Sequence, residues 1–112
     1  MQENHKQLIE KYIHKMNSIF TSYGEYSQED IDLITDFGRK IAYGSYFGKN
    51  IGSYGDVISN DLKKKRPDLI NGDTEFFFGC CRMAGEYIAN GTPEIIDRTL
   101  SKAYRLVKDS KS

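Results

Sequence analysis

The chain has 112 residues, and its 16 basic and 16 acidic side chains give a formal net charge of zero at neutral pH. A protein with zero net charge does not attract nucleic acid or membranes through its overall electric field. Binding to either would therefore need a local charged patch. No apolar run approaches the roughly 18 residues that span a bilayer, and the start of the chain is too polar for a secretion signal. The length predicts a single domain over residues 1–112, which the patterns described below indicate is helical. The polar start of the chain and the lack of a long apolar run predict a location in the cytoplasm.

The first predicted helix carries its apolar residues in one stripe. They recur at spacings of one, three and four, which is typical of an amphipathic helix. Gly24 is expected to end the helix, because glycine readily adopts the left-handed conformation found after many helices. The stripe comprises Leu8, Ile9, Tyr12, Ile13, Met16, Ile19, Phe20 and Tyr23.

A second helix is predicted to begin after Ser27, whose side chain can cap the free amides of the first turn. Five acidic residues and no basic residue lie between Gly24 and Gly38, so this half of the helix should present a negative surface. The apolar face comprises Ile31, Ile34, Phe37, Ile41 and Ala42.

A short third helix is predicted from the capping pattern Ser53-x-x-Asp56. It should end just before Pro67, because proline disfavours helical geometry in the residue that precedes it. Its apolar residues are Val57, Ile58 and Leu62, and Leu69 and Ile70 after it should fill part of the core.

The fourth helix is predicted to follow a turn at Asn71-Gly72, with Asp73 or Thr74 as its cap, and to end near Gly91. Apolar side chains cover a wide part of its circumference, so we expect it to be the most central helix. They are Phe76, Phe77, Phe78, Cys80, Cys81, Met83, Ala84, Tyr87 and Ile88.

A fifth helix is predicted to start at Thr92-Pro93-Glu94, which combines a capping hydroxyl, a proline in the first turn and an acid. Its apolar face comprises Ile96, Leu100, Ala103, Tyr104 and Val107. No segment alternates with the period of a strand. The fold class is therefore all-α, a compact bundle of four to five helices with a connection rich in glycine and tyrosine between helices 2 and 3.

That connection, residues 42–56 with the sequence AYGSYFGKNIGSYGD, is the most site-like part of the chain. Residues 44–50 differ from a phosphate-binding P-loop, because only three residues separate the two glycines and Asn50 replaces the required hydroxyl residue. One interpretation is a joint between helices, in which Gly44, Gly48 and Gly52 share a helix face if the second helix continues through them.

The other interpretation of this stretch is a protein-binding loop, because tyrosines beside glycine and serine give much contact area for little loss of entropy. Its contact residues would be Tyr43, Tyr46, Phe47, Lys49 and Tyr54.

Nucleic-acid binding is the alternative function. Two basic groups could meet phosphates, one in a run and one along a predicted helix face. They are Lys63, Lys64, Lys65 and Arg66, and Arg98, Lys102 and Arg105. The acidic start of the second helix and the zero net charge argue against it. A third alternative is a homodimer in which the acidic edge of one copy meets the basic edge of another.

The sequence contains no convincing catalytic or metal-binding pattern. Glu10 and His14 have a spacing that can seat a metal, but two ligands are too few. Cys80 and Cys81 are adjacent, cannot easily bridge each other, and are expected to be reduced core residues. We expect no cofactor and no metal.

The sequence thus predicts a small non-enzymatic protein that acts by occupying a surface of a partner protein, as a regulator or an inhibitor. Small tyrosine-rich helical proteins of this kind are common among inhibitors, immunity proteins and accessory proteins of phages and plasmids. That is a likeness of kind and not of residues.

Overall fold

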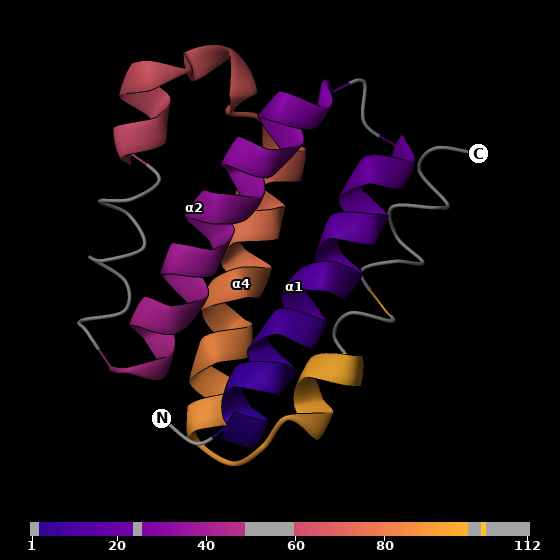
Figure 1. Ribbon diagram of the computed structural model, residues 1–112, viewed down its shortest axis with the longest axis vertical. Coiled ribbons are helices and arrows are strands. Elements are labelled where there is room, and N and C mark those ends of the chain that lie inside the picture. Colours follow the sequence, from indigo (N-terminus) through magenta and orange to yellow (C-terminus); the bar gives the residue numbers. More distant parts are fainter. Residues whose placement is uncertain (1–2, 24–25, 49–59, 99–101, 103–112) are drawn as a thin grey trace.

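The computed structural model describes residues 3–23, 26–48, 60–98 and 102, and of residues 19–23 it describes the backbone alone. Over these residues the chain is helical, with no strand, as Figure 1 shows. Helix α1 spans Glu3–Tyr23, α2 spans Gln28–Tyr46, and α4 spans Gly72–Ala89. Shorter helical segments cover residues 60–65 and 94–98, and a 3-10 helix, η1, covers Pro67–Leu69. The predicted all-α bundle of four to five helices is confirmed.

The direction of the helices follows from contacts between them. Along α1 and α2 the contacts run in opposite order, since Glu10 bonds to Arg39 and the earlier His5 bonds to the later Tyr46. These two helices are therefore antiparallel. Between α2 and α4 the order is the same, since Gly38 lies against Phe77 while Ala42 and Ser45 lie against Gly85. α2 and α4 are therefore parallel, and α4 lies behind α1 and α2 in the view of Figure 1.

The core lies where these three helices meet. Most of the predicted apolar stripe residues that the structure describes are buried in it, including Tyr12, which is 2% exposed, and Cys81, which is 0% exposed. Leu62 and Leu69 enter from the segment before α4, and Ile96 enters from the segment after it. Ile70 packs against the core from its edge. Both cysteines are free and buried, as predicted. Leu8, Met83 and Tyr87 of these stripes are partly buried and pack against the core, and Phe76 is 47% exposed.

Two glycines allow α2 and α4 to approach closely. A Cβ atom on Gly38 would lie 2.6 Å from a ring carbon of Phe77, and one on Gly85 would overlap the carbonyl oxygen of Ala42. This pair of helices packs most extensively in the bundle. The glycines therefore set the distance between α2 and α4.

Among the described helix ends, the start of α2 and the end of α4 agree with the sequence prediction, whereas the start of α4 does not. Ser27 caps α2 by accepting a hydrogen bond from the amide of Asp30, and Gly91, with φ of 77°, follows α4 in the left-handed region. The prediction of Asp73 or Thr74 as the cap of α4 is wrong. Asn71 is the cap, because its side chain accepts from the amides of Asp73 and Thr74 while the Thr74 hydroxyl accepts from the amide of Asn71.

The stretch rich in glycine and tyrosine begins inside α2. The helix continues to Tyr46, and Gly48 follows with φ of 69°, outside the helical region. The idea that Gly44, Gly48 and Gly52 share one helix face is therefore wrong, because Gly48 leaves the helix before the face can continue.

Some of the predicted helix boundaries lie outside the described residues. They are the stop at Gly24, the start of the third helix at Ser53 and Asp56, and the far part of the fifth helix. The segment at residues 60–65 ends before Pro67, as predicted.

Candidate protein-binding site at the end of helix α2

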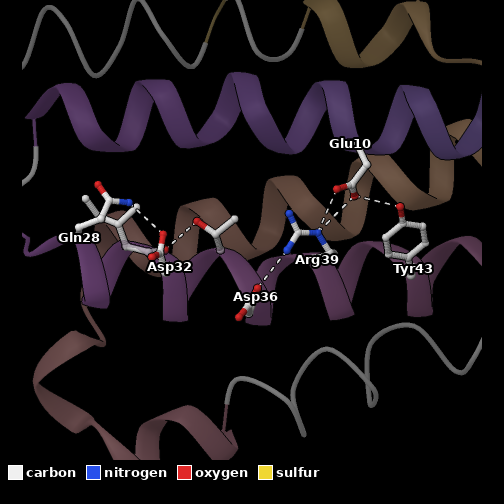
Figure 2. A network of polar contacts seen from close by, with 8 residues as sticks. Glu10, Gln28, Asp32, Asp36, Arg39 and Tyr43 are labelled. Carbon is white, nitrogen blue, oxygen red and sulfur yellow. Dashed lines mark hydrogen bonds and ion pairs between the residues drawn. The ribbon is translucent and has the colours of Figure 1, made fainter.

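The side of α2 that faces α1 is held by a polar network, which Figure 2 shows. Glu10 of α1 accepts from the Nε of Arg39 at 3.1 Å and from the hydroxyl of Tyr43 at 2.9 Å. Arg39 also pairs with Asp36 one turn earlier at 3.0 Å. One carboxylate of α1 thus holds two residues of α2, and Tyr43 has a structural role in the network.

Tyr43 is held as a neutral phenol. Partial burial disfavours the phenolate, and the nearby negative charge of Glu10 disfavours it further, so that the pKa of Tyr43 is raised from 10.0 to about 12. Its hydroxyl therefore remains a hydrogen-bond donor throughout the physiological pH range.

Three aromatic rings meet where α1 begins and α2 ends. His5 Nδ1 and the Tyr46 hydroxyl lie 2.7 Å apart, and their rings are in an edge-to-face arrangement with centroids 5.5 Å apart. The Phe47 ring meets the Tyr46 ring edge-to-face at 5.2 Å. We call His5, Tyr46 and Phe47 the aromatic cluster.

Phe47 is the outermost ring of this cluster. It is 57% exposed, whereas Tyr43 and Tyr46 are partly buried and pack against the core. The backbone amide of Phe47 donates to the carbonyl of Tyr43, which fixes the residue at the last turn of α2. Of the predicted contact residues, Lys49 and Tyr54 lie outside the described residues.

The predicted basic run is partly neutralised. Arg66 pairs with Asp68 at 2.9 Å and with Asp30 at 3.2 Å, and these carboxylates raise its pKa further. Lys65 pairs with Asp61 at 3.3 Å. Lys63 and Lys64 are exposed, and no ion pair within the described part of the chain involves them.

The second predicted basic group is only partly described. Arg98 and Lys102 are exposed, and Arg105 lies outside the described residues. Within the described ranges, the structure does not bring this group together with residues 63–66.

The structure gives no metal centre among the residues it describes. His14 is exposed, and Glu10 is already held by Arg39 and Tyr43. Burial raises the pKa of the Cys80 thiol to about 11, and complete burial raises the pKa of Cys81 well above its usual value. A thiol with a raised pKa is a poor nucleophile at neutral pH, which agrees with a packing role.

His5 is the residue of this site that sequence reasoning missed. It lies in a polar start without apolar periodicity, and its partner Tyr46 is distant in the sequence. No local pattern reports such a contact. The exposure of Phe47 cannot be read from the sequence either, because buried and exposed aromatic residues look alike there.

Comparison with known proteins gives no further guide to the site. The chain matches no protein-family model, and neither the curated proteins nor the solved structures contain a significant match. Among the described residues, no helix combines the length and the apolar character that crossing a bilayer demands.

Proposed function

We propose that this protein is a non-enzymatic protein-binding module that acts by occupying a surface of another protein, as a regulator or an inhibitor. Phe47, which is 57% exposed at the end of α2, carries the proposal. It is one of two large hydrophobic side chains that are exposed in the described part of the chain.

The contacts that fix the Phe47 side chain support a role as a central contact residue of an interface. The Tyr46 ring contacts the Phe47 ring edge-to-face, and His5 holds Tyr46 in turn through an edge-to-face contact and a hydrogen bond of 2.7 Å. A ring that is fixed before binding loses little entropy when a partner covers it, and such aromatic residues often dominate the energy of protein interfaces. Lys49 and Tyr54 follow shortly after in the chain and belong to the proposed contact surface.

Charge supports a protein partner over a nucleic acid. Arg66 and Lys65 form ion pairs with carboxylates, so half of the basic run is already neutralised. The acidic residues Glu29, Asp32 and Asp36 are exposed on α2 and would repel a phosphate backbone. The electrostatic footprint of a module that binds nucleic acid is a basic patch or stripe clustered on one face.

The proposed location is the cytoplasm, where the two free cysteines remain reduced. A small regulator or inhibitor encoded by a phage or another mobile element fits the size and the helical fold of the chain.

The test compares partner capture by the wild-type protein and by Phe47→Ala. Bait protein is incubated with a lysate of the source organism, and captured proteins are identified by mass spectrometry. Loss of a central interface aromatic typically costs at least about 2 kcal/mol, which lowers the affinity more than tenfold. We expect the partner to be captured by the wild-type protein and by Phe47→Tyr, but not by Phe47→Ala.

Phe76→Ala is the matched control, because it removes the other exposed phenyl ring, which lies near the start of α4 and not at the end of α2. Capture that survives Phe47→Ala would contradict the proposed site. The alternative function is tested by a gel shift with nucleic acid. Binding that falls steeply with salt and is lost when Lys63, Lys64, Lys65 and Arg66 are neutralised would replace the proposal.

A further inference from the structure

The outer face of α4 carries a stripe that the described residues leave partly exposed. Phe76 is 47% exposed, Gly79 is exposed, and Met83 is partly exposed at the edge of the core. Their spacings of three and four place them on one side of the helix. In Figure 1 this helix lies behind α1 and α2, so that its outer side points away from both.

Gly79 has no packing role among the described residues. A Cβ atom at this position would meet nothing within 4 Å, and the neighbouring backbone is regular helix. Glycine is, apart from proline, the least favourable residue for the interior of a helix. This differs from Gly85 of the same helix, which the contact with Ala42 requires. Contacts within the described residues therefore do not explain the lack of a side chain at Gly79.

Two charged side chains flank the stripe on one side. Glu75 lies one turn before Gly79 and Arg82 lies one turn after it, and their spacing of seven places them on the same flank. Both side chains are exposed, and no ion pair in the described ranges involves either. The flank thus has a negative and a positive end, with Gly79 between them.

We propose that this face of α4 binds the same face of a second copy of the chain, with the two α4 helices antiparallel and a two-fold axis passing beside Gly79. In an antiparallel pair, residues at nearly equal distances on either side of the axis face each other, and like flanks meet. Each pair here is offset by one residue, a helical rise of about 1.5 Å that these long side chains can span. Glu75 of each copy then faces Arg82 of the other, and Phe76 faces Met83. The two Gly79 residues meet at the axis, where the missing side chains allow the backbones to approach.

The residues of this face are complementary to the same residues in reverse order, which identifies a second copy of the chain as the binding partner. A single axis at Gly79 brings the ion pairs and the apolar pairs into register to within an offset of one residue, and it also allows the close approach. An unrelated partner would need to present the same pattern in reverse. The surface is separate from the aromatic cluster at the end of α2, so this inference does not depend on the proposed function.

The decisive experiment uses two charge-reversed variants. Glu75→Arg places two positive residues opposite each other in a dimer, and Arg82→Glu places two negative ones there. We expect sedimentation equilibrium to give a two-chain mass for the wild-type protein and the single-chain mass of 12.9 kDa for each variant alone. An equal mixture of the two variants should recover the two-chain mass. In the mixed dimer, the two positive residues on the flank of one copy face the two negative residues on the flank of the other.

A second variant tests the close approach. Gly79→Gln has open space in the single chain and should fold at least as well as wild-type protein, but its side chain separates the two helices. We expect it to be monomeric, while Phe47→Ala at the other exposed ring remains dimeric. A wild-type protein that is monomeric at every concentration would overturn the proposal. A mixture of the charge variants that stays monomeric would overturn the antiparallel pairing.

Discussion

Gly85 and Gly79 lie six residues apart on α4 and differ in what surrounds them. Gly85 faces the backbone of α2 at Ala42, where a side chain has no room, whereas Gly79 faces open space. The sequence alone does not distinguish them, because both interrupt the same apolar helix. The two glycines differ only in whether another helix packs against the side of α4 on which each of them lies.

Gly85→Ala should destabilise the protein, because the new methyl group would overlap a backbone atom that moves only if α2 moves. Overpacking of this kind costs about 1–3 kcal/mol of unfolding free energy. Gly79→Ala is the matched control and should raise stability by roughly 0.5–1 kcal/mol, since alanine favours the helix. Urea unfolding at a protein concentration low enough to exclude association measures both. Equal stability of Gly85→Ala and wild-type protein would refute the close contact.

At the scale of the elements, the sequence predicted the helical segments that the structure describes and several of their ends. Ser27, Pro67 and Gly91 mark helix ends through local chemistry that is readable from neighbouring residues. The sequence places the start of α4 two to three residues late, because Asn71-Gly72 also fits a turn. The reciprocal hydrogen bonds between Asn71 and Thr74 make Asn71 the cap of α4, and these bonds exist only once the helix has formed.

Asn71→Ala removes this cap and should lower the unfolding free energy by about 1 kcal/mol. It also removes the hydrogen bond of 2.7 Å that the side-chain amide of Asn71 donates to the Tyr26 hydroxyl. Asn71→Asp keeps the oxygen that accepts from the backbone and should restore most of the loss. Thermal unfolding followed by circular dichroism compares the three proteins. If the alanine variant melts at the wild-type temperature, the cap contributes nothing measurable.

At the scale of the whole molecule, the arrangement of the helices was not predictable. Apolar stripes identify buried faces, but they do not tell which helix packs on which. The hydrogen bonds between α1 and α2, such as those of Glu10 with Arg39 and Tyr43, join residues that are 29 and 33 positions apart in the sequence. The same limit applies to the candidate site, where Tyr43 and Tyr46 were selected with Phe47 although, of these three, only Phe47 is exposed to a partner.

Tyr43→Phe tests the contribution of the network between α1 and α2. The Tyr43 pKa is raised in the folded state from 10.0 to about 12, so the stabilisation from its neutral hydroxyl is present below pH 10 and is lost as the pH rises through about 12. The variant should lose about 1 kcal/mol at neutral pH, typical of one hydrogen bond. Its stability should also fall less steeply than that of wild-type protein between about pH 10 and about pH 12.

Urea unfolding across this pH range provides the measurement. Tyr87→Phe serves as the control, because its hydroxyl makes no hydrogen bond within the part of the chain that the structure describes. Identical alkaline profiles for Tyr43→Phe and wild-type protein would exclude the bond to Glu10 as a source of stability.

The parallel direction of α2 and α4 also has a consequence for the order of folding. Residues 47–71 must bring the chain back from one end of the bundle to the other before α4 can begin, whereas only residues 24–27 separate α1 from α2. Closing the shorter loop costs less chain entropy, so we expect α1 and α2 to pair before α4 docks. The largest interface of the bundle then forms last, when α4 docks with its glycines against a surface that is already assembled.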